Sequence, residues 1–256
     1  MVRQLQKWNG AGNDFLVDVA TPSELAHWNA ERAVAVCDRT HGLGADGLLL
    51  AALEGDSVTM TLYNADGSIA EMSGNGIRCL VAAVRRATKA TWRELLVTTL
   101  AGPRTVSLEM SSETNGHGTG LMGTVAFLDA PEGSLGAADV GNPHVVVRDD
   151  DTWTDLDRER VAHTMQAAMP ESANVEFVTI HHPARVAIKV YERGVGWTQA
   201  CGTGSVATAA VLHSLGLTGP KAVVENPGGE LIVSLDGSEA TLGGPVAFEG
   251  DMEWTL

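Results

Sequence analysis

Short runs in which apolar and polar residues alternate recur along the chain and predict β-strands. Six runs carry this pattern most clearly: SVTMTLYN (57–64), RTVSLEM (104–110), GTVAFLD (123–129), VAIKVYE (186–192), KAVVEN (221–226) and ELIVSLD (230–236). Residues that favour turns separate such runs, as in GPRT (102–105), NPGGE (226–230) and LDGSEA (235–240). Each half of the chain is therefore expected to be mostly β.

Two longer apolar stretches predict one main helix in each half. They are GIRCLVAAVRRATKA (76–90) and GSVATAAVLHSLGL (204–217), and each follows a glycine-rich turn, GNG or GTG. Shorter helices are predicted over 24–39 and 158–169. Helices combined with predominantly antiparallel strands indicate the α+β class.

The two halves repeat one pattern at a nearly constant spacing of 128 residues. GADGLLLA (44–51) aligns with SANVEFVT (172–179) at this spacing, GNDF (12–15) aligns with GNPH (141–144) at 129, and TVSLE (105–109) aligns with IVSLD (232–236) at 127. The residue pairs that are 128 apart are Tyr63 and Tyr191, Ser73 and Cys201, Gly74 and Gly202, and Gly76 and Gly204. So stable an offset indicates a duplication.

We therefore expect two similar lobes, related by a pseudo-two-fold axis, each a mostly antiparallel sheet wrapped around a central helix. The first lobe is expected to span residues 1–117, ending in the polar, glycine-rich stretch SSETNGHGTG (111–120), with a return strand at 246–256. The second is expected to span 118–245.

Charge and cysteine content narrow the classes of function. The net charge of −15 argues against a nucleic-acid partner, and no apolar run approaches the ~18 residues of a membrane span. The first fifteen residues have no apolar core of a signal peptide, so a cytoplasmic protein is expected. Three cysteines form no disulfide framework, and no CxxC or HExxH suggests a metal. Cys37 and Cys79 lie in apolar helical stretches and are expected to be buried.

The two glycine-rich turns, SGNG (73–76) and CGTG (201–204), are candidate anion sites. A turn that opens a helix presents free backbone N–H groups and the positive end of the helix dipole. A single such turn is a common cap, but two matched turns, each beginning with a nucleophile-type residue, favour function. If the lobes face each other, Ser73 and Cys201 flank the α-carbon of a bound amino acid and can exchange its proton on opposite faces. No lysine site for pyridoxal phosphate is apparent, so no cofactor is expected.

Long motifs between residue 9 and about 205 resemble those of diaminopimelate epimerases, which are cofactor-independent two-base enzymes of lysine and peptidoglycan precursor synthesis. The motifs occur in the family's order: GNDF (12–15), DRTHGLGADG (38–47), NADGSIAEMSGNGIRC (64–79), GNPHVV (141–146), NVEFV (174–178) and ERGVGWTQACGTGS (192–205). Proline racemases share the fold, but NADGS and ERGVG favour the diaminopimelate branch. The resemblance implies epimerisation of the LL form to the meso form, and a homodimer.

The resemblance also implies roles for individual residues. Cys201 and the residue at position 73 would be the two acid/base groups, with His144 and Glu192 beside them. An arginine fork suits a carboxylate, so Arg193 would bind the distal carboxylate of the substrate. The remaining substrate-binding residues implied are Asn13, Asn64, Gly74, Asn75, Asn142, Asn174, Gly202 and Thr203. Asp46, Asp66 and Ser68 are expected to stabilise loops through turns.

Ser73 departs from the family pattern, which has cysteine at this position. The pKa of a hydroxyl lies ~7 units above the ~8.5 of a thiol, a difference of ~10 kcal/mol against proton abstraction. Three explanations remain open: compensation by His144 or water in a working epimerase, one-sided proton exchange or elimination by Cys201, or an introduced substitution that traps substrate. Two other functions also remain open, a non-catalytic amino-acid-binding protein and an isomerase or dehydratase for another small amino acid.

Overall fold

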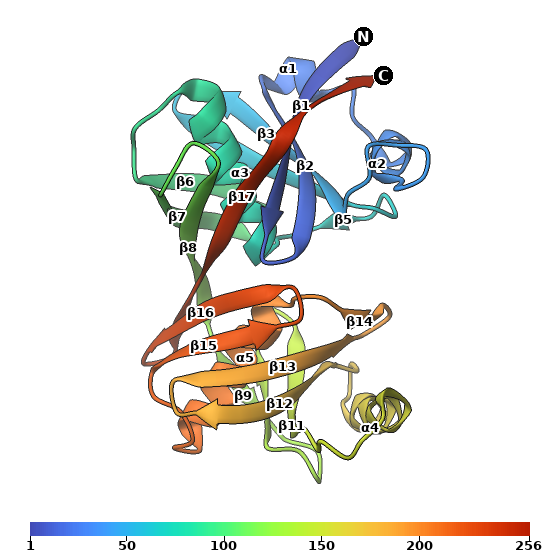
Figure 1. Cartoon of the computed structure of the whole chain (residues 1–256), viewed down its shortest axis with the longest axis vertical. Helices are drawn as coiled ribbons and strands as arrows, with labels where there is room; N and C mark the ends of the chain where they lie inside the picture. Colours follow the sequence, from blue (N-terminus) through green and yellow to red (C-terminus); the bar gives the residue numbers. More distant parts are fainter. The chain divides into compact units, whose positions relative to one another are not determined.

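A computed structural model describes all residues from 1 to 256, and the chain divides into two compact units (Figure 1). The first unit comprises Met1–Gly120 and Gly244–Leu256, and the second comprises Leu121–Gly243. Seventeen strands and five helices make up the chain, so the α+β class predicted from the sequence is confirmed. None of the five helices has both the length and the apolar character of a membrane span.

The strands of the first unit combine antiparallel and parallel pairs. Its elements are β1 (Val2–Gly10), β2 (Asn13–Ala20), α1 (Pro22–Leu25), α2 (Ala30–Cys37), β3 (Gly47–Glu54), β4 (Ser57–Asn64), β5 (Ile69–Ala70), α3 (Gly74–Thr88), β6 (Glu94–Thr99), β7 (Gly102–Met110) and β8 (Asn115–Thr124). The last strand of the chain, β17 (Glu239–Thr255), ends in this unit, where it pairs with β1. β2 is parallel to β3, β3 is antiparallel to β4, β4 is parallel to β6, and β6 is antiparallel to β7.

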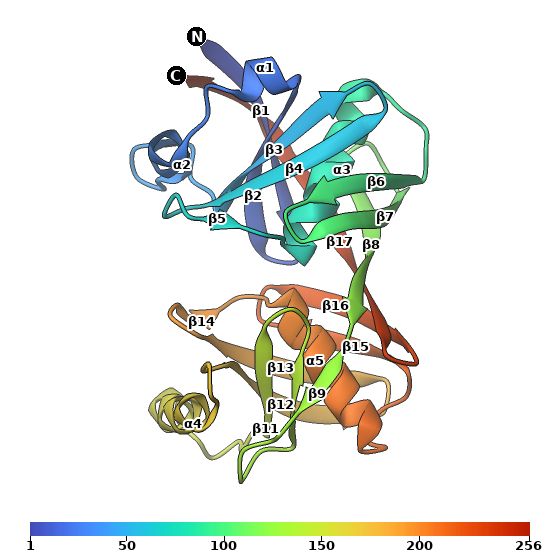
Figure 2. The same cartoon turned by 180° about the vertical axis from the view of Figure 1, so that it is seen from behind.

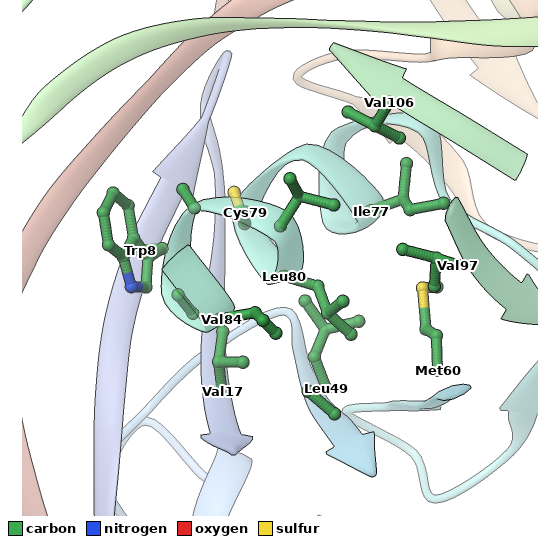
Figure 3. Close-up of a cluster of buried hydrophobic side chains, with 14 of the residues drawn as sticks. Trp8, Val17, Leu49, Met60, Ile77, Cys79, Leu80, Val84, Val97 and Val106 are labelled. Atoms are coloured by element: carbon green, nitrogen blue, oxygen red, sulfur yellow. The ribbon is translucent and has the colours of Figure 1, made fainter. Parts of the chain in front are cut away.

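Helix α3 is central to the core of the first unit. All ten residues from Asn75 to Val84 are buried, which requires apolar strands around the helix. Figure 3 shows side chains of α3 gathered with those of the surrounding strands; the labelled residues are Trp8, Val17, Leu49, Met60, Ile77, Cys79, Leu80, Val84, Val97 and Val106. Cys79 is fully buried there, and Cys37 is buried at the end of α2, as predicted.

The second unit repeats the order of strand pairing found in the first. Its elements are β9 (Ala126–Leu128), β10 (Gly136–Asp139), β11 (Pro143–Arg148), α4 (Asp155–Ala168), β12 (Asn174–His182), β13 (Arg185–Glu192), β14 (Gly196–Thr198), α5 (Gly202–Ser214), β15 (Lys221–Asn226), β16 (Gly229–Asp236) and the first part of β17. β11 is parallel to β12, β12 is antiparallel to β13, β13 is parallel to β15, and β15 is antiparallel to β16. Figure 2 shows α5 crossing the strands of this unit, as α3 does in the first.

Several local predictions were wrong. The polar, glycine-rich stretch 111–120 was expected to link the lobes, but its residues 115–120 form the first part of β8, because residues 116–120 pair with Met110 to Val106 of β7. GPRT (102–105) lies at the start of β7 and is not a turn. The stretch 24–39 splits into α1 and α2, because the Asn29 side chain caps a new helix by accepting a hydrogen bond from the Arg32 amide. The main helices begin two residues earlier than predicted, since Ser73 and Cys201 are themselves N-cap residues.

Candidate functional site

Ser73 caps the N-terminus of α3 in the first unit. Its backbone is extended, and its Oγ accepts a hydrogen bond of 3.0 Å from the Gly76 amide. The glycines on either side of Asn75 leave the first turn without bulky side chains. The free amides of this turn and the helix dipole favour an anion.

A chain of hydrogen bonds fixes this first turn from below. Arg78 donates from Nη1 to the Gly74 carbonyl and from Nη2 to Asn75 Oδ1, both at 2.8 Å. Asn75 Nδ2 in turn donates to Asn13 Oδ1 at 2.7 Å. Arg78 is buried, and its desolvation lowers the pKa of the guanidinium to about 10. The expected binding residues Asn13 and Asn75 are therefore in direct contact, oriented by an arginine to which the sequence analysis gave no role.

The side chain of Asp46 supports the same network. Its Oδ2 accepts from Asn13 Nδ2 at 3.1 Å, and its Oδ1 accepts from the Arg39 guanidinium at 2.7 Å. Asn64 lies at the end of β4 and donates from Nδ2 to Ser68 Oγ at 2.9 Å. Asp66 accepts from the Ser68 amide at 2.9 Å, which is the turn expected for this loop.

Cys201 caps the N-terminus of α5 in the second unit, in the position that Ser73 has on α3. Its Sγ accepts a hydrogen bond of 3.3 Å from the Gly204 amide, and the Thr203 hydroxyl lies 3.5 Å from the sulfur. The Cys201 amide donates to Asn226 Oδ1 at 3.2 Å. Gly202 and Thr203, both expected to bind substrate, thus form the first turn of the helix that carries the thiol.

Two carboxylates lie close to the Cys201 thiol. Burial raises the pKa of the thiol above its ordinary value, and the negative charges of Glu192 and Glu176 raise it further. Burial also raises the pKa of Glu192, an effect opposed by hydrogen bonds from the Thr198 hydroxyl (2.8 Å) and from the Cys201 thiol. In this environment the neutral thiol is favoured, and a proton can pass between sulfur and carboxylate.

His144 and Glu176 form a fully buried pair beneath this turn. His144 Nδ1 lies 2.7 Å from Glu176 Oε1, and His144 Nε2 lies 3.0 Å from Asn142 Oδ1. Glu176 Oε2 has no hydrogen-bond partner. The potential metal-ligand atoms of His144, Glu176 and Cys201 all lie within 4.8 Å of one another, which is close enough for one metal ion to bind all three. The histidine and the carboxylate are hydrogen-bonded to each other, however, and this arrangement suits proton exchange with the thiol.

The sequence analysis gave Glu176 no role. The available signal was a charged residue in the middle of the otherwise uncharged segment NVEFV (174–178), all five residues of which are buried at the start of β12. A buried glutamate requires a partner, and the partner is His144, on the parallel neighbour strand β11.

The first unit has apolar residues where the second has this ionisable pair. A Cβ added to Gly76 would contact the Leu49 side chain at 3.5 Å, whereas one added to Gly204 would contact Glu176. Phe15 is the counterpart of His144 in the repeat of GNDF and GNPH. Leu49 and Phe15 are both buried in the apolar core. Ser73 therefore lacks the carboxylate and imidazole that lie beneath Cys201.

Asn174 and Arg193 lie at the ends of the hairpin formed by β12 and β13. Asn174 Oδ1 accepts from the Arg193 amide at 2.9 Å, which fixes the backbone of the following loop. The exposed Arg193 guanidinium binds the Glu171 carbonyl. Of the expected site residues, the first unit brings Asn13, Ser73, Gly74 and Asn75 together at α3, with Asn64 at the end of β4. The second unit gathers Asn142, His144, Glu192, Cys201, Gly202 and Thr203 around the start of α5.

Comparisons with known proteins agree on one family. The family model for diaminopimelate epimerase matches residues 6–128 and 136–248. The diaminopimelate epimerase of Mycobacteroides abscessus is 37% identical, over 96% of this chain and 94% of that protein. The diaminopimelate epimerase of Mycobacterium avium is 35% identical, over 93% and 92% of the two chains.

Solved structures with the same fold are more distant in sequence. A PhzF-family phenazine biosynthesis protein of Bacillus anthracis superposes with a TM-score of 0.73 at 13% identity, over all of both chains. A hydroxyproline epimerase of Agrobacterium vitis superposes with a TM-score of 0.68 at 17% identity, over 99% of this chain and 91% of the other. At such identities the likeness shows the fold alone.

Proposed function

Because the chain belongs to the diaminopimelate epimerase family, and is thus a cofactor-independent amino-acid epimerase, we propose that it interconverts LL- and meso-diaminopimelate. The observation that carries the proposal is the buried Cys201 thiol at the N-terminus of α5, surrounded by Glu192, His144 and Glu176. This is the arrangement of a thiol that alternates between acid and base.

In the proposed reaction Cys201 removes or returns the α-proton on one face of the substrate. The thiol first passes its proton to Glu192, whose negative charge lies near enough to raise the pKa of the thiol. The thiolate then takes the α-proton, and its raised pKa makes it a strong base once formed. Negative charge that develops on the substrate carboxylate is stabilised by the free amides at the starts of the helices, because these donors are already oriented. The assignment of the α-carboxylate to Gly74, Asn75, Gly202 and Thr203 follows from membership of the family.

Ser73 is the proposed proton donor on the opposite face, and solvent returns a proton to its oxygen while Glu192 releases to solvent the proton that it took from the thiol. As a base Ser73 is at a disadvantage of ~10 kcal/mol relative to a thiol, and the apolar Leu49 and Phe15 stand where the second unit has Glu176 and His144. Proton abstraction is therefore expected to be fast on the Cys201 face and slow on the Ser73 face. The same asymmetry favours a second candidate function, one-sided α-proton exchange on an amino acid held in this site.

The remaining polar residues are proposed to select the substrate. Arg193 would exchange its Glu171 carbonyl for the distal carboxylate of diaminopimelate. Side-chain amides would hydrogen-bond the distal amino and carboxylate groups; the residues assigned this role are Asn13, Asn64, Asn142 and Asn174. His144, which is fully buried and bonded through both ring nitrogens, would help to deprotonate the catalytic thiol. The reaction belongs to lysine and peptidoglycan precursor synthesis, and we place it in the cytoplasm, in a homodimer.

Proton NMR in D2O with each diaminopimelate stereoisomer tests the proposal, and chiral chromatography of the same samples follows inversion. We expect deuterium to enter the α-position with inversion, and Cys201→Ala to abolish this. Ser73→Cys should raise the rate of inversion in both directions, because the equilibrium constant fixes the ratio of the two. Exchange without inversion would establish the one-sided alternative. Binding by calorimetry without any exchange, in the native chain and in Ser73→Cys, would establish a binding protein. If the protein shows neither binding nor exchange of diaminopimelate, diaminopimelate is refuted as the ligand.

A further inference from the structure

Arg78 is a buried cation at the first turn of α3. Helical side chains point toward the N-terminus, so an arginine four residues after Gly74 reaches back under that turn. Its side chain is 1% exposed, and its two hydrogen bonds go to the Gly74 carbonyl and the Asn75 side chain. The guanidinium therefore lies directly beneath the amides that follow Ser73.

No carboxylate contacts this guanidinium. The other strongly buried arginine, Arg158, binds the buried Asp149, and the half-buried Arg3 binds the buried Asp18. Both partners of Arg78 are neutral, and its Nε is buried without a partner. A buried charge without an opposite charge destabilises the folded protein, so an arginine at this position is unusual unless an anion binds nearby.

The repeat shows that the charge is specific to the serine turn. Position 206, which is 128 residues after Arg78, is a buried valine on α5. The second unit instead has Glu176 and Glu192 near its turn. Gly118 on β8 makes room for Arg78, since a Cβ there would lie 3.0 Å from its Cγ. The Ser73 turn is therefore cationic and the Cys201 turn is rich in carboxylates.

We propose that Arg78 is a positioning residue whose buried positive charge holds a substrate carboxylate at the Ser73 turn. It acts through the first turn of α3, orienting its amides through Gly74 and Asn75 and adding its own charge to the helix dipole. The inference rests on the proposed function in one respect, the identity of the carboxylate as that of an amino-acid substrate. The anion site itself does not depend on that identity.

Two variants separate the charge of Arg78 from its role in packing. Arg78→Met removes the charge while keeping an unbranched side chain, and Arg78→Lys keeps the charge but loses the planar fork. Arg86→Met is the matched control, because Arg86 lies at the far end of α3 and pairs with the exposed Asp251. The first readout is the titration of backbone amide shifts of residues 74–77 with sodium acetate. The second is KM and kcat for α-proton exchange on diaminopimelate, and the third is the thermal unfolding midpoint.

We expect acetate to shift the amide resonances of the native chain, of Arg78→Lys and of Arg86→Met. In Arg78→Met the affinity for acetate should fall about tenfold, or ~1.4 kcal/mol. KM should rise in Arg78→Met by a similar factor, with Arg78→Lys intermediate. If Arg78→Met and Arg78→Lys lose acetate affinity equally, and their unfolding midpoints fall in parallel, the proposal is overturned. The guanidinium would then act only through the hydrogen bonds that stabilise the first turn. Unchanged acetate binding in Arg78→Met would also overturn it. Acetate binding that depends on Arg78, without turnover of diaminopimelate, would refute the proposed substrate and leave the anion site standing.

Discussion

Replacing Gly204 with alanine tests the close approach of α5 to the buried Glu176. Gly204 lies in the first turn of the helix, and an added Cβ would press against the carboxylate, 3.1 Å from its Cδ and 3.2 Å from its Cγ. Glu176 cannot yield easily, because its Oε1 is hydrogen-bonded to His144 and the side chain is fully buried. Either α5 or the carboxylate must move.

The expected cost follows from three contributions. Overpacking a core costs ~1–3 kcal/mol. Weakening a buried hydrogen bond to a charged group costs ~1.5–3 kcal/mol. Alanine gains up to ~1 kcal/mol over glycine in a helix. The net expectation is a destabilisation of ~3 kcal/mol, which lowers the unfolding midpoint of a unit of this size by ~10 °C.

Gly76→Ala is the matched control in the first unit. Its Cβ would lie 3.1 Å from Ser73 Cβ and 3.5 Å from a methyl group of Leu49, which can adjust. The helix gain then offsets most of the strain, and we expect stability to change by less than ~1 kcal/mol. Differential scanning calorimetry of both variants measures the difference. A Gly204→Ala midpoint within ~2 °C of the native one, or an equal fall in Gly76→Ala, would refute the reasoning.

Three further outcomes are expected from the charged groups. Burial raises the pKa of Glu192, so the folded state holds this proton more tightly and stability falls as pH rises from the ordinary glutamate pKa through the folded one. Glu192→Gln keeps an acceptor for Thr198 and should reduce the decrease of the unfolding midpoint between pH 4 and 8. An unchanged pH dependence would contradict the assignment of this decrease to Glu192. Because the pKa of Cys201 is raised, iodoacetamide should alkylate it slowly at pH 8 and faster in Glu192→Gln, as peptide mass spectrometry can follow. Equal rates in the two proteins would exclude an effect of the Glu192 charge on the thiol. Arg158→Met leaves the buried Asp149 unpaired and should cost about 3 kcal/mol in urea unfolding, whereas a loss below ~1 kcal/mol would show that the pair contributes little.

Local patterns in the sequence were sufficient for much of the fold. The alternating runs at 57–64 and 221–226 became strands with those bounds, because the apolar face of each is buried in the sheet. The starts of α3 and α5 were misplaced by two residues, since glycine has low helix propensity and its presence in a first turn hides the cap.

The missed residues depend on contacts between distant segments. Glu176 acquires its role from His144 on another strand and from the approach of Gly204, and neither is visible in NVEFV. Arg78 resembles any helical arginine in sequence. Its lack of a carboxylate partner becomes evident only once β8 covers its side chain through Gly118. A local pattern predicts an element, whereas the charge state of a buried group depends on everything packed around it.

The path of the chain through its two units has a consequence for synthesis on the ribosome. The second unit is complete once residue 243 has emerged, although it follows the first in sequence. The first unit still lacks the end of β17, which contributes the buried Val246 to its core and Phe248, whose ring lies 5.2 Å from that of Trp8. A nascent chain therefore carries an incomplete N-terminal core, with one edge of β1 unpaired, until translation passes these residues. Ribosome stalling before residue 246 should leave this unit exposed to proteases while the later-made unit is already folded.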